Sequence, residues 1–162
     1  MIALFRIDER LIHGQIAVAW SKTLNLTHIV VADDGAATSD IQQAALKMAA
    51  PATTKVAIRD LDGAAEVLKD ERLADKRVMV VVKTVADALR LVKMVPGVPE
   101  VNVGNCGFLG DAISKEGYTK YTQYIRLNAK DIEDLKEIQS IVPVGIQIVP
   151  NEPKKPLSSI LS

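Results

Sequence analysis

The sequence lacks several features that define large classes of proteins. Cys106 is the single cysteine among 162 residues, so an internal disulfide is excluded. The 20 lysines and arginines are matched by 20 acidic residues, and a chain without net charge has no long-range field to collect nucleic acid or anionic lipid. An anion can therefore be bound only at a local site.

Long apolar runs are also missing. The longest runs, such as residues 78–82, are far shorter than the ~20 residues that span a bilayer. The first residues lack the basic and apolar regions of a signal peptide, so we expect a cytoplasmic protein. If this protein serves a membrane process, we expect it to do so through partner proteins.

Short runs rich in valine and isoleucine recur along the chain, and such runs are typical of strands. They lie near residues 2–7, 28–32, 54–58, 78–83, 100–103, 121–127 and 144–149. The runs at 29–32 and 78–82 are continuously apolar rather than alternating, which is typical of parallel strands covered on both faces. In contrast, the proline-rich segment 150–156 opposes both helix and central strand, so we expect it to be irregular.

Helical patterns lie between these runs. The segment near 84–95 and the one that begins at Asn128 each place apolar residues on one helical face. Other helix starts are expected at the capping residues Thr38 or Ser39, Asp60 and Thr84. The alternation predicts an α/β fold in one domain, residues 1–162, with a doubly wound, mostly parallel sheet of about seven strands and helices on both faces.

The most informative segment pairs an arginine with a histidine. Arg10 and His13 lie where the first strand would pass into a helix, and ligands of doubly wound sheets bind at the edge to which such loops lead. His13 would stand close to the helix N-terminus, where free backbone N–H groups and the helix dipole hold anions. Because a neutral imidazole is nucleophilic and Arg10 keeps its charge, we predict phosphoryl transfer through a phosphohistidine.

Neighbouring residues complete this predicted site. Backbone groups of Gly14 and Gln15 are expected to bind phosphate, and the missing side chain of Gly14 permits a bulky group to approach. We assign Asp8 an orienting role, whereas Glu9 is expected to be solvated. Asn105 lies in a glycine-rich loop, residues 104–110, that would form the wall of the predicted site opposite His13.

Other chemistries are less well supported by the sequence. Cys106 has no recognisable partner to stabilise a thiolate, and one cysteine with two separated histidines makes no metal site, so no metal or cofactor is expected. His28 is assigned a structural role. The pair Asp33 and Asp34 resembles the acidic pair of a phosphate receiver, but it follows the second strand instead of the first. It also lacks the glycine motif that would accompany dinucleotide binding.

The residues from Arg6 to Ile16, RIDERLIHGQI, closely resemble the active-site segment of the IIB component of mannose/fructose/sorbose-type sugar phosphotransferase systems. Further similarities follow in the expected order at residues 78–80, 101–105 and 131–133, so the resemblance covers essentially the whole chain. By this resemblance the fold is a doubly wound α/β sheet, and the protein is a protein-histidine sugar phosphotransferase.

The resemblance also implies the partners. His13 would accept phosphate on Nδ1 from a phosphohistidine of the IIA component and pass it to a sugar, with Arg10 as charge partner. Transfer to sugar would occur at the membrane components IIC and IID, so the protein would dock transiently at the cytoplasmic face. We expect IIA on another chain, since 162 residues leave room for IIB alone. The alternative is a non-catalytic module of the same fold that binds a nucleotide or another anion.

Overall fold

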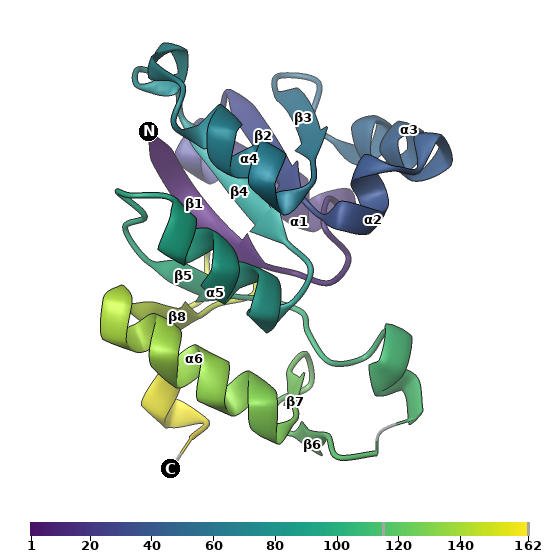
Figure 1. Cartoon of the computed structure of the whole chain (residues 1–162), viewed down its shortest axis with the longest axis vertical. Coiled ribbons are helices and arrows are strands. Elements are labelled where there is room, and N and C mark those ends of the chain that lie inside the picture. Colours follow the sequence, from purple (N-terminus) through teal and green to yellow (C-terminus); the bar gives the residue numbers. More distant parts are fainter. Residues whose placement is uncertain (115, 162) are drawn as a thin grey trace.

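The computed structural model describes residues 1–114 and 116–161, and a central β-sheet organises them (Figure 1). In this part of the chain the sheet has seven strands in the order β3-β2-β4-β1-β5-β8-β9, all parallel to their neighbours except β9. They are β1 (Ile2–Ile7), β2 (His28–Ala32), β3 (Lys55–Arg59), β4 (Val78–Val82), β5 (Val101–Val103), β8 (Val144–Ile146) and β9 (Lys155–Pro156). The predicted fold class is confirmed.

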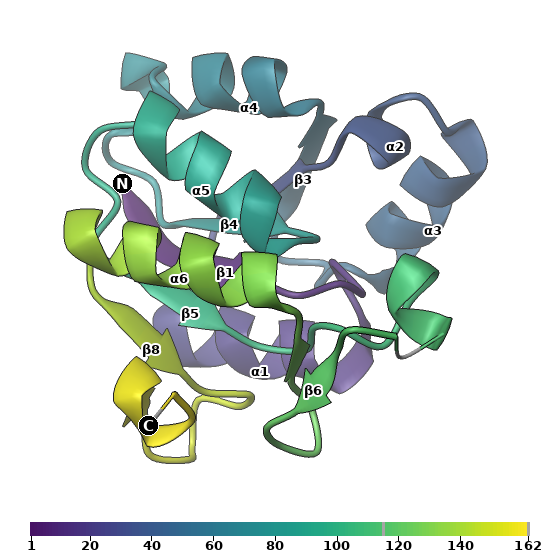
Figure 2. The ribbon, with the colours of Figure 1, turned by 60° about the horizontal axis from the view of Figure 1, so that its bottom comes forward.

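Helices cover both faces of the sheet, as predicted. In Figure 2, α4, α5 and α6 lie on one face and α1 lies on the other. Within the described residues, none of the helices is long and apolar enough to cross a bilayer. The helices are α1 (Gly14–Leu24), α2 (Asp34–Ala37), α3 (Asp40–Ala49), α4 (Leu61–Leu68), α5 (Val85–Met94) and α6 (Ala129–Ile141), with the 3-10 turns η1 (Glu71–Leu73), η2 (Gly110–Ser114) and η3 (Leu157–Ser159).

The alternation of side chains along β1 divides the core into two layers. Phe5 and Ile7 pack into the cluster under α4, α5 and α6, whereas Leu4 packs into the cluster under α1. Because successive strand residues point to opposite faces, Arg6 points to the α1 side, and Asp8, two residues further on, follows it. The ion pair of Arg6 and Asp8 therefore lies on the α1 side of the sheet, at the carboxyl end of β1.

The order of the strands positions the candidate site. β1 and β4 are neighbours, but the chain leaves β1 into α1 on one face and leaves β4 into α5 on the other. Such a divergence opens a crevice at the carboxyl ends of the strands, where ligands of open α/β sheets bind. The loop between β1 and α1 carries His13, so the histidine lies at this edge.

Side chains begin the helices as the sequence indicates. Ser39, Asp60 and Thr84 accept hydrogen bonds from the first turns of α3, α4 and α5, and Asn128 forms a capping box with Asp131 at α6. Thr38 instead ends α2. Each cap satisfies a backbone donor that the helix itself leaves unpaired.

Two strand predictions are wrong. The run at 121–127 does not enter the main sheet: β6 (Thr119–Lys120) and β7 (Arg126–Leu127) form a separate antiparallel pair. Polar residues at 122 and 123 make this run unsuitable for a strand covered on both faces. Conversely, the proline-rich tail is not wholly irregular, because β9 pairs with β8. Pro156 is tolerated there because β9 is an edge strand.

Candidate functional site

His13 stands directly before α1 at the carboxyl edge of the sheet. Its backbone is extended, with φ −149° and ψ 129°, and it is the N-cap residue of α1. Its side chain does not cap the helix, although capping is the usual role of a polar side chain at this position. The first N–H groups of α1 therefore remain available to another acceptor.

The imidazole of His13 is held by a buried carboxylate. His13 Nε2 lies 3.0 Å from Asp8 Oδ2, and the side chain of Asp8 is 1% exposed whereas that of His13 is 20% exposed. Within residues 1–114 and 116–161, Nδ1 has no hydrogen-bond partner. One nitrogen is thus tied to the protein and the other is left for a ligand.

The same carboxylate gathers several further donors. Asp8 Oδ2 accepts from Arg6 Nε and Nη2, both at 3.3 Å, and from Asn105 Nδ2 at 3.1 Å. Asp8 Oδ1 accepts from the backbone N–H of Arg10 at 3.0 Å. The carboxylate is therefore fixed from three parts of the chain, and the orientation of His13 is fixed with it.

The electrostatics keep Asp8 ionised. Burial by itself would raise the pKa of this carboxyl, but the hydrogen bond with His13 and the positive charge of Arg6 outweigh burial and hold the pKa below its ordinary value. The carboxylate therefore remains a hydrogen-bond acceptor for His13 at neutral pH.

Arg6 is buried beneath the site with all of its polar contacts inside the protein. Its guanidinium donates to Asn102 Oδ1 at 2.6 Å and to the carbonyls of Gln147 and Ile148 at 2.8 and 3.1 Å. It also lies 5.6 Å from the ring of Trp20, whose Nε1 donates to Ile148. These partners fix the guanidinium of Arg6, and its hydrogen bonds to Asp8 Oδ2 fix the carboxylate in turn.

Gly104 makes room for Arg6. A Cβ at residue 104 would lie 2.3 to 2.9 Å from the guanidinium atoms of Arg6, far inside contact distance. The residue is thus a glycine because a buried side chain passes against its backbone. This is a different requirement from the ligand contact predicted for the loop.

The remaining predicted residues lie at the mouth of the site. Arg10 is exposed, and its guanidinium has no ion-pair partner in the described part of the chain. Gly14 and Gln15 are exposed in the first turn of α1. Gly14 has a φ of +40°, and a Cβ there would meet no atom within 4 Å, so conformation rather than crowding requires the glycine.

Glu9 differs from its expected role as a solvated residue. Its carboxylate accepts from the backbone N–H groups of Phe108 and Leu109 at 3.0 to 3.1 Å, and its own N–H donates to the carbonyl of Asn105 at 2.9 Å. The loop after β1 is therefore bonded to the loop after β5. This bonding positions Asn105 against Asp8.

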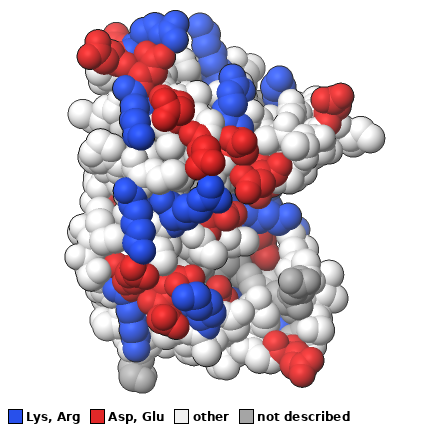
Figure 3. All heavy atoms as spheres, viewed as in Figure 1, with Lys and Arg blue, Asp and Glu red and all other residues white. Residues whose placement is uncertain are grey.

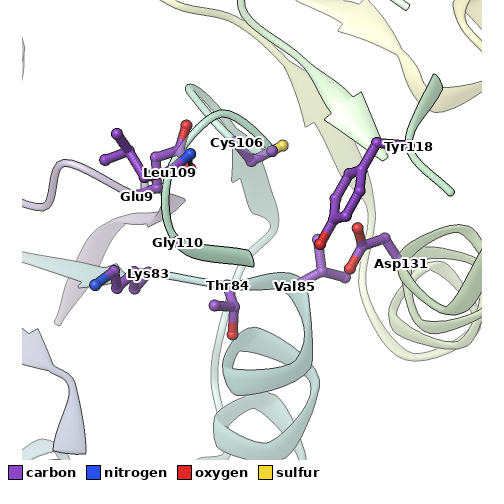
Figure 4. Close-up of a pocket in the computed structure, with 10 residues that line it drawn as sticks. Glu9, Lys83, Thr84, Val85, Cys106, Leu109, Gly110, Tyr118 and Asp131 are labelled. Atoms are coloured by element: carbon purple, nitrogen blue, oxygen red, sulfur yellow. Dashed lines mark hydrogen bonds between the residues drawn. The ribbon is translucent and has the colours of Figure 1, made fainter. Parts of the chain in front are cut away.

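A cavity of about 190 Å³ lies beside this junction, at the carboxyl ends of β1, β4 and β5. Figure 4 shows Glu9, Lys83 and Leu109 on one side of it and Tyr118 and Asp131 on the other. His13 does not line this cavity, so the cavity and the histidine are adjacent features of one edge.

Cys106 also borders the cavity, but its surroundings disfavour a reactive thiolate. The residue is 5% exposed, and burial, followed by the negative charges of Glu9 and Asp131, raises the pKa of the thiol far above its ordinary value. A nucleophilic cysteine needs the opposite environment, with exposure and nearby positive charge.

The other acidic and basic candidates have structural roles. Asp33 caps α2, and Asp34 accepts from the backbone of Leu61, so neither presents a free receiver carboxylate. His28 bonds to Thr27 at the opposite end of β2 from the site. Among the described residues, no grouping of three or more histidine, cysteine, aspartate or glutamate side chains could hold a metal ion.

Sequence reasoning missed Arg6 and Asn102 as parts of the site. Both lie in otherwise apolar strands, and the register of β1 and β5 pairs them directly. A charged and an amide side chain inside runs that must be covered on both faces is a signal that could have identified them, because buried polar groups need partners.

These features define a class of protein: a doubly wound α/β domain that presents an oriented histidine beside a helix N-terminus. The chain belongs to the sorbose subfamily of IIB components of the phosphotransferase system (PTS), whose family model matches residues 2–162. This assignment agrees with the family that the segment around His13 resembles.

Known relatives support the assignment. A probable phosphotransferase enzyme IIB component of Streptococcus pyogenes is 46% identical over 107 residues, 66% of each chain, and the sorbose-specific EIIB component of Klebsiella pneumoniae is 32% identical over 64% of this chain and 63% of its own. The mannose-specific EIIAB component of Escherichia coli is 34% identical, but the match spans 33% of its length. The aligned part is thus one third to two thirds of these relatives.

Solved structures match over a greater length. The IIB domain of the sorbose permease from Klebsiella pneumoniae has a TM-score of 0.89 and 26% identity, and the match covers 99% of this chain and 96% of that one. The N-acetylgalactosamine-specific IIB component 1 from Escherichia coli has a TM-score of 0.84 and 29% identity over 97% and 99%. The similarity therefore extends over the whole fold.

Proposed function

We propose that this protein is a phosphocarrier of a sugar phosphotransferase system and that His13 carries the phosphoryl group on Nδ1. One observation carries the proposal: His13 Nε2 is bonded at 3.0 Å to a buried carboxylate, which leaves Nδ1 as the nitrogen without a partner among the described residues. Membership of the IIB family supports a phosphotransferase role and disfavours a non-catalytic anion-binding module.

The proposed transfer needs no cofactor. The Nδ1 lone pair of neutral His13 attacks the phosphorus of a phosphohistidine on the IIA component. A new N–P bond forms while the donor's N–P bond breaks, and the electron pair of the broken bond returns to the donor imidazole. The proton on Nε2 stays on His13, where Asp8 stabilises the positive ring. In the next step the oxygen of a sugar hydroxyl attacks phosphorus and an O–P bond forms. The N–P bond breaks, its electron pair returns to Nδ1 of His13, and the hydroxyl proton passes to solvent.

Positive groups at the mouth stabilise the phosphoryl oxygens. Arg10 supplies a permanent charge, and the N–H groups of Gly14 and Gln15 supply donors at the positive end of the α1 dipole. Phosphoryl transfer depends mostly on alignment and charge stabilisation, so these groups suffice in principle. Asp8 and Asn105 act through His13 by holding the ring.

The partners follow from the proposed function. Residues 1–162 form one IIB domain that receives phosphate from IIA and delivers it to a sugar at the IIC and IID membrane components. The mixed charges of the surface in Figure 3 favour brief docking over permanent attachment to anionic lipid. The protein works at the cytoplasmic face of the membrane, where these partners meet.

Intact mass spectrometry tests the proposal. The protein is incubated with phosphoenolpyruvate, the general phosphotransfer proteins and a IIA component, and the mass should rise by one acid-labile phosphate. His13→Ala should abolish this rise, whereas Cys106→Ser should retain it and thereby separate the two candidate nucleophiles. Labelling of the His13→Ala protein, or no labelling of the wild type, would overturn the assignment.

A further inference from the structure

One face of α3 is apolar and uncovered. Ile41 is 85% exposed and Met48 is 87% exposed, and Ala44 and Ala45 between them are exposed as well. The spacing i, i+3, i+4, i+7 places all four on one side of the helix. Leu46, on the other side, is buried in the core. The helix therefore has a second apolar face that no part of the described chain covers.

A second uncovered apolar segment follows β5. Leu109 is 47% exposed and Ile113, in η2, is 67% exposed. Eight large apolar side chains are exposed among the described residues, and four of them belong to α3 and this segment. We call these four the apolar rim: Ile41, Met48, Leu109 and Ile113.

The two halves of the apolar rim flank His13. In the sheet β1 pairs with β4 and β5, and β2 lies beyond β4. After the carboxyl end of β2 the chain forms α2 and then α3, and after the carboxyl end of β5 it forms η2. The loop that carries His13 leaves β1 between them. Figures 1 and 2 agree that α3 and η2 border the same edge of the molecule, with the β1–α1 loop beside them. Half of the large exposed apolar side chains among the described residues therefore belong to elements at the edge where His13 lies.

We propose that the apolar rim is the surface on which the phosphoryl-donor protein docks. This proposal rests on the proposed function and adds the residues that bind the donor. Transfer between two protein histidines requires the two surfaces to meet around a ring that is 20% exposed, so the flanking side chains become buried in the complex. Interfaces place apolar side chains, methionine among them, in such positions.

Charge complementarity favours the donor as the occupant. The donor arrives with the negative phosphoryl group, and it meets an Arg10 that has no ion-pair partner in the described residues, next to the N-terminus of α1. The membrane components meet the phosphorylated protein, in which the same positive charge is already neutralised. Attraction at this edge is therefore greatest for the phosphorylated donor.

The test uses a double substitution on α3. Ile41→Glu with Met48→Lys removes both large apolar side chains, keeps the net charge, and places an acidic residue near the start of the helix and a basic one near its end, where the dipole favours each. Ile113→Ser tests the other half of the rim. Ile141→Lys, at the end of α6, is the matched control, since Ile141 is also exposed but belongs to no element that borders His13.

Transfer is measured from the phosphorylated IIA component over a range of donor concentrations. Both rim variants should raise the KM for the donor about tenfold with kcat within about twofold, and Ile141→Lys should change neither. Phosphoramidate, a small donor that needs no docking surface, should label every variant at the wild-type rate, and circular dichroism checks that each variant is folded.

Three results would overturn the docking proposal. The first is an unchanged KM for the donor in the rim variants, and the second is an equal rise in the control. The third is a defect confined to the later transfer to sugar, which would assign the rim to the membrane components. If the wild type accepts phosphate neither from IIA nor from phosphoramidate, the proposed function fails instead, so the two failures are distinguishable.

Discussion

Asp8→Asn should separate the two roles of the buried carboxylate. The substitution keeps the shape of the side chain but removes its charge, which deprives the buried guanidinium of Arg6 of its ion-pair partner. Loss of one partner from a buried ion pair costs about 3–5 kcal/mol, against a total stability of about 5–15 kcal/mol for a domain. We therefore expect a folded but clearly destabilised protein.

The same substitution should slow phosphoryl transfer. Both oxygens of the Asp8 carboxylate accept hydrogen bonds, whereas asparagine has one acceptor oxygen and an NH₂ group in place of the other. A donor that faces this NH₂ group loses its hydrogen bond. Losing a charge-assisted bond to His13 worth about 1.5–3 kcal/mol corresponds to a rate loss of roughly 10- to 100-fold. Quench-flow measurement of a single turnover from phosphorylated IIA gives this rate, and urea unfolding gives the free energy.

Asp62→Asn is the matched control. Asp62 pairs with Arg90 at 3.0 Å, but both side chains are more than half exposed, so we expect a loss of less than about 1 kcal/mol and no change in transfer rate. The reasoning is refuted if Asp8→Asn costs no more stability than the control. It is also refuted if Asp8→Asn transfers phosphate at the wild-type rate at a temperature where it is fully folded.

The pH dependence provides a third measurement for Asp8. Its folded-state pKa lies below the ordinary value of 3.8, so its contribution to stability is complete above about pH 4 and disappears as the pH falls through the lower folded-state value. As the pH is lowered below about 4, the free energy of unfolding of the wild type should therefore fall by more than that of Asp8→Asn. The free energies are measured by urea unfolding at each pH, and equal losses in the wild type and in Asp8→Asn would contradict this assignment.

Other substitutions test other parts of the site. Gly104→Ala should cost at least about 1–3 kcal/mol by overpacking against Arg6, whereas Gly35→Ala, whose Cβ meets only an ordinary contact, should cost far less in the same urea assay. The thiol of Cys106 should react with a disulfide reagent only after unfolding, and fast reaction of the native protein would contradict its burial. Arg10→Ala should slow transfer about 100-fold and leave Tm unchanged within about 2 °C, because this arginine is exposed; an unaltered rate would remove it from the mechanism.

Local patterns in the sequence predicted most of the fold. The strands at 28–32 and 78–82 follow from continuous runs of apolar residues, and the caps Ser39, Asp60 and Thr84 follow from the chemistry of single residues. These signals act over a few positions, so they can be read without knowledge of the tertiary structure. The pairing of β9 with β8 depends on contacts made by the rest of the sheet, and sequence reasoning missed it.

The candidate site was likewise predictable only where its residues are close together in the chain. Arg10 and His13 are close in the chain, and their proximity to a helix start identified them. The contact of Asn105 with Asp8 joins residues 97 positions apart, and its donor and acceptor could be matched only once β1 and β5 were neighbours. Glu9 is informative because its sequence suggests a solvated acid, yet the backbone of a distant loop binds it.

The hydrogen bonds from Arg6 to the carbonyls of Gln147 and Ile148 connect residues 141 and 142 positions apart. During synthesis, the segment around His13 would emerge from the ribosome long before these carbonyls exist. Asp8 and Arg6 can reach their final arrangement only after residues 147 and 148 have been made. Under the proposed function, competence to carry phosphate would thus be acquired only after synthesis has passed residue 148, long after His13 itself has been made.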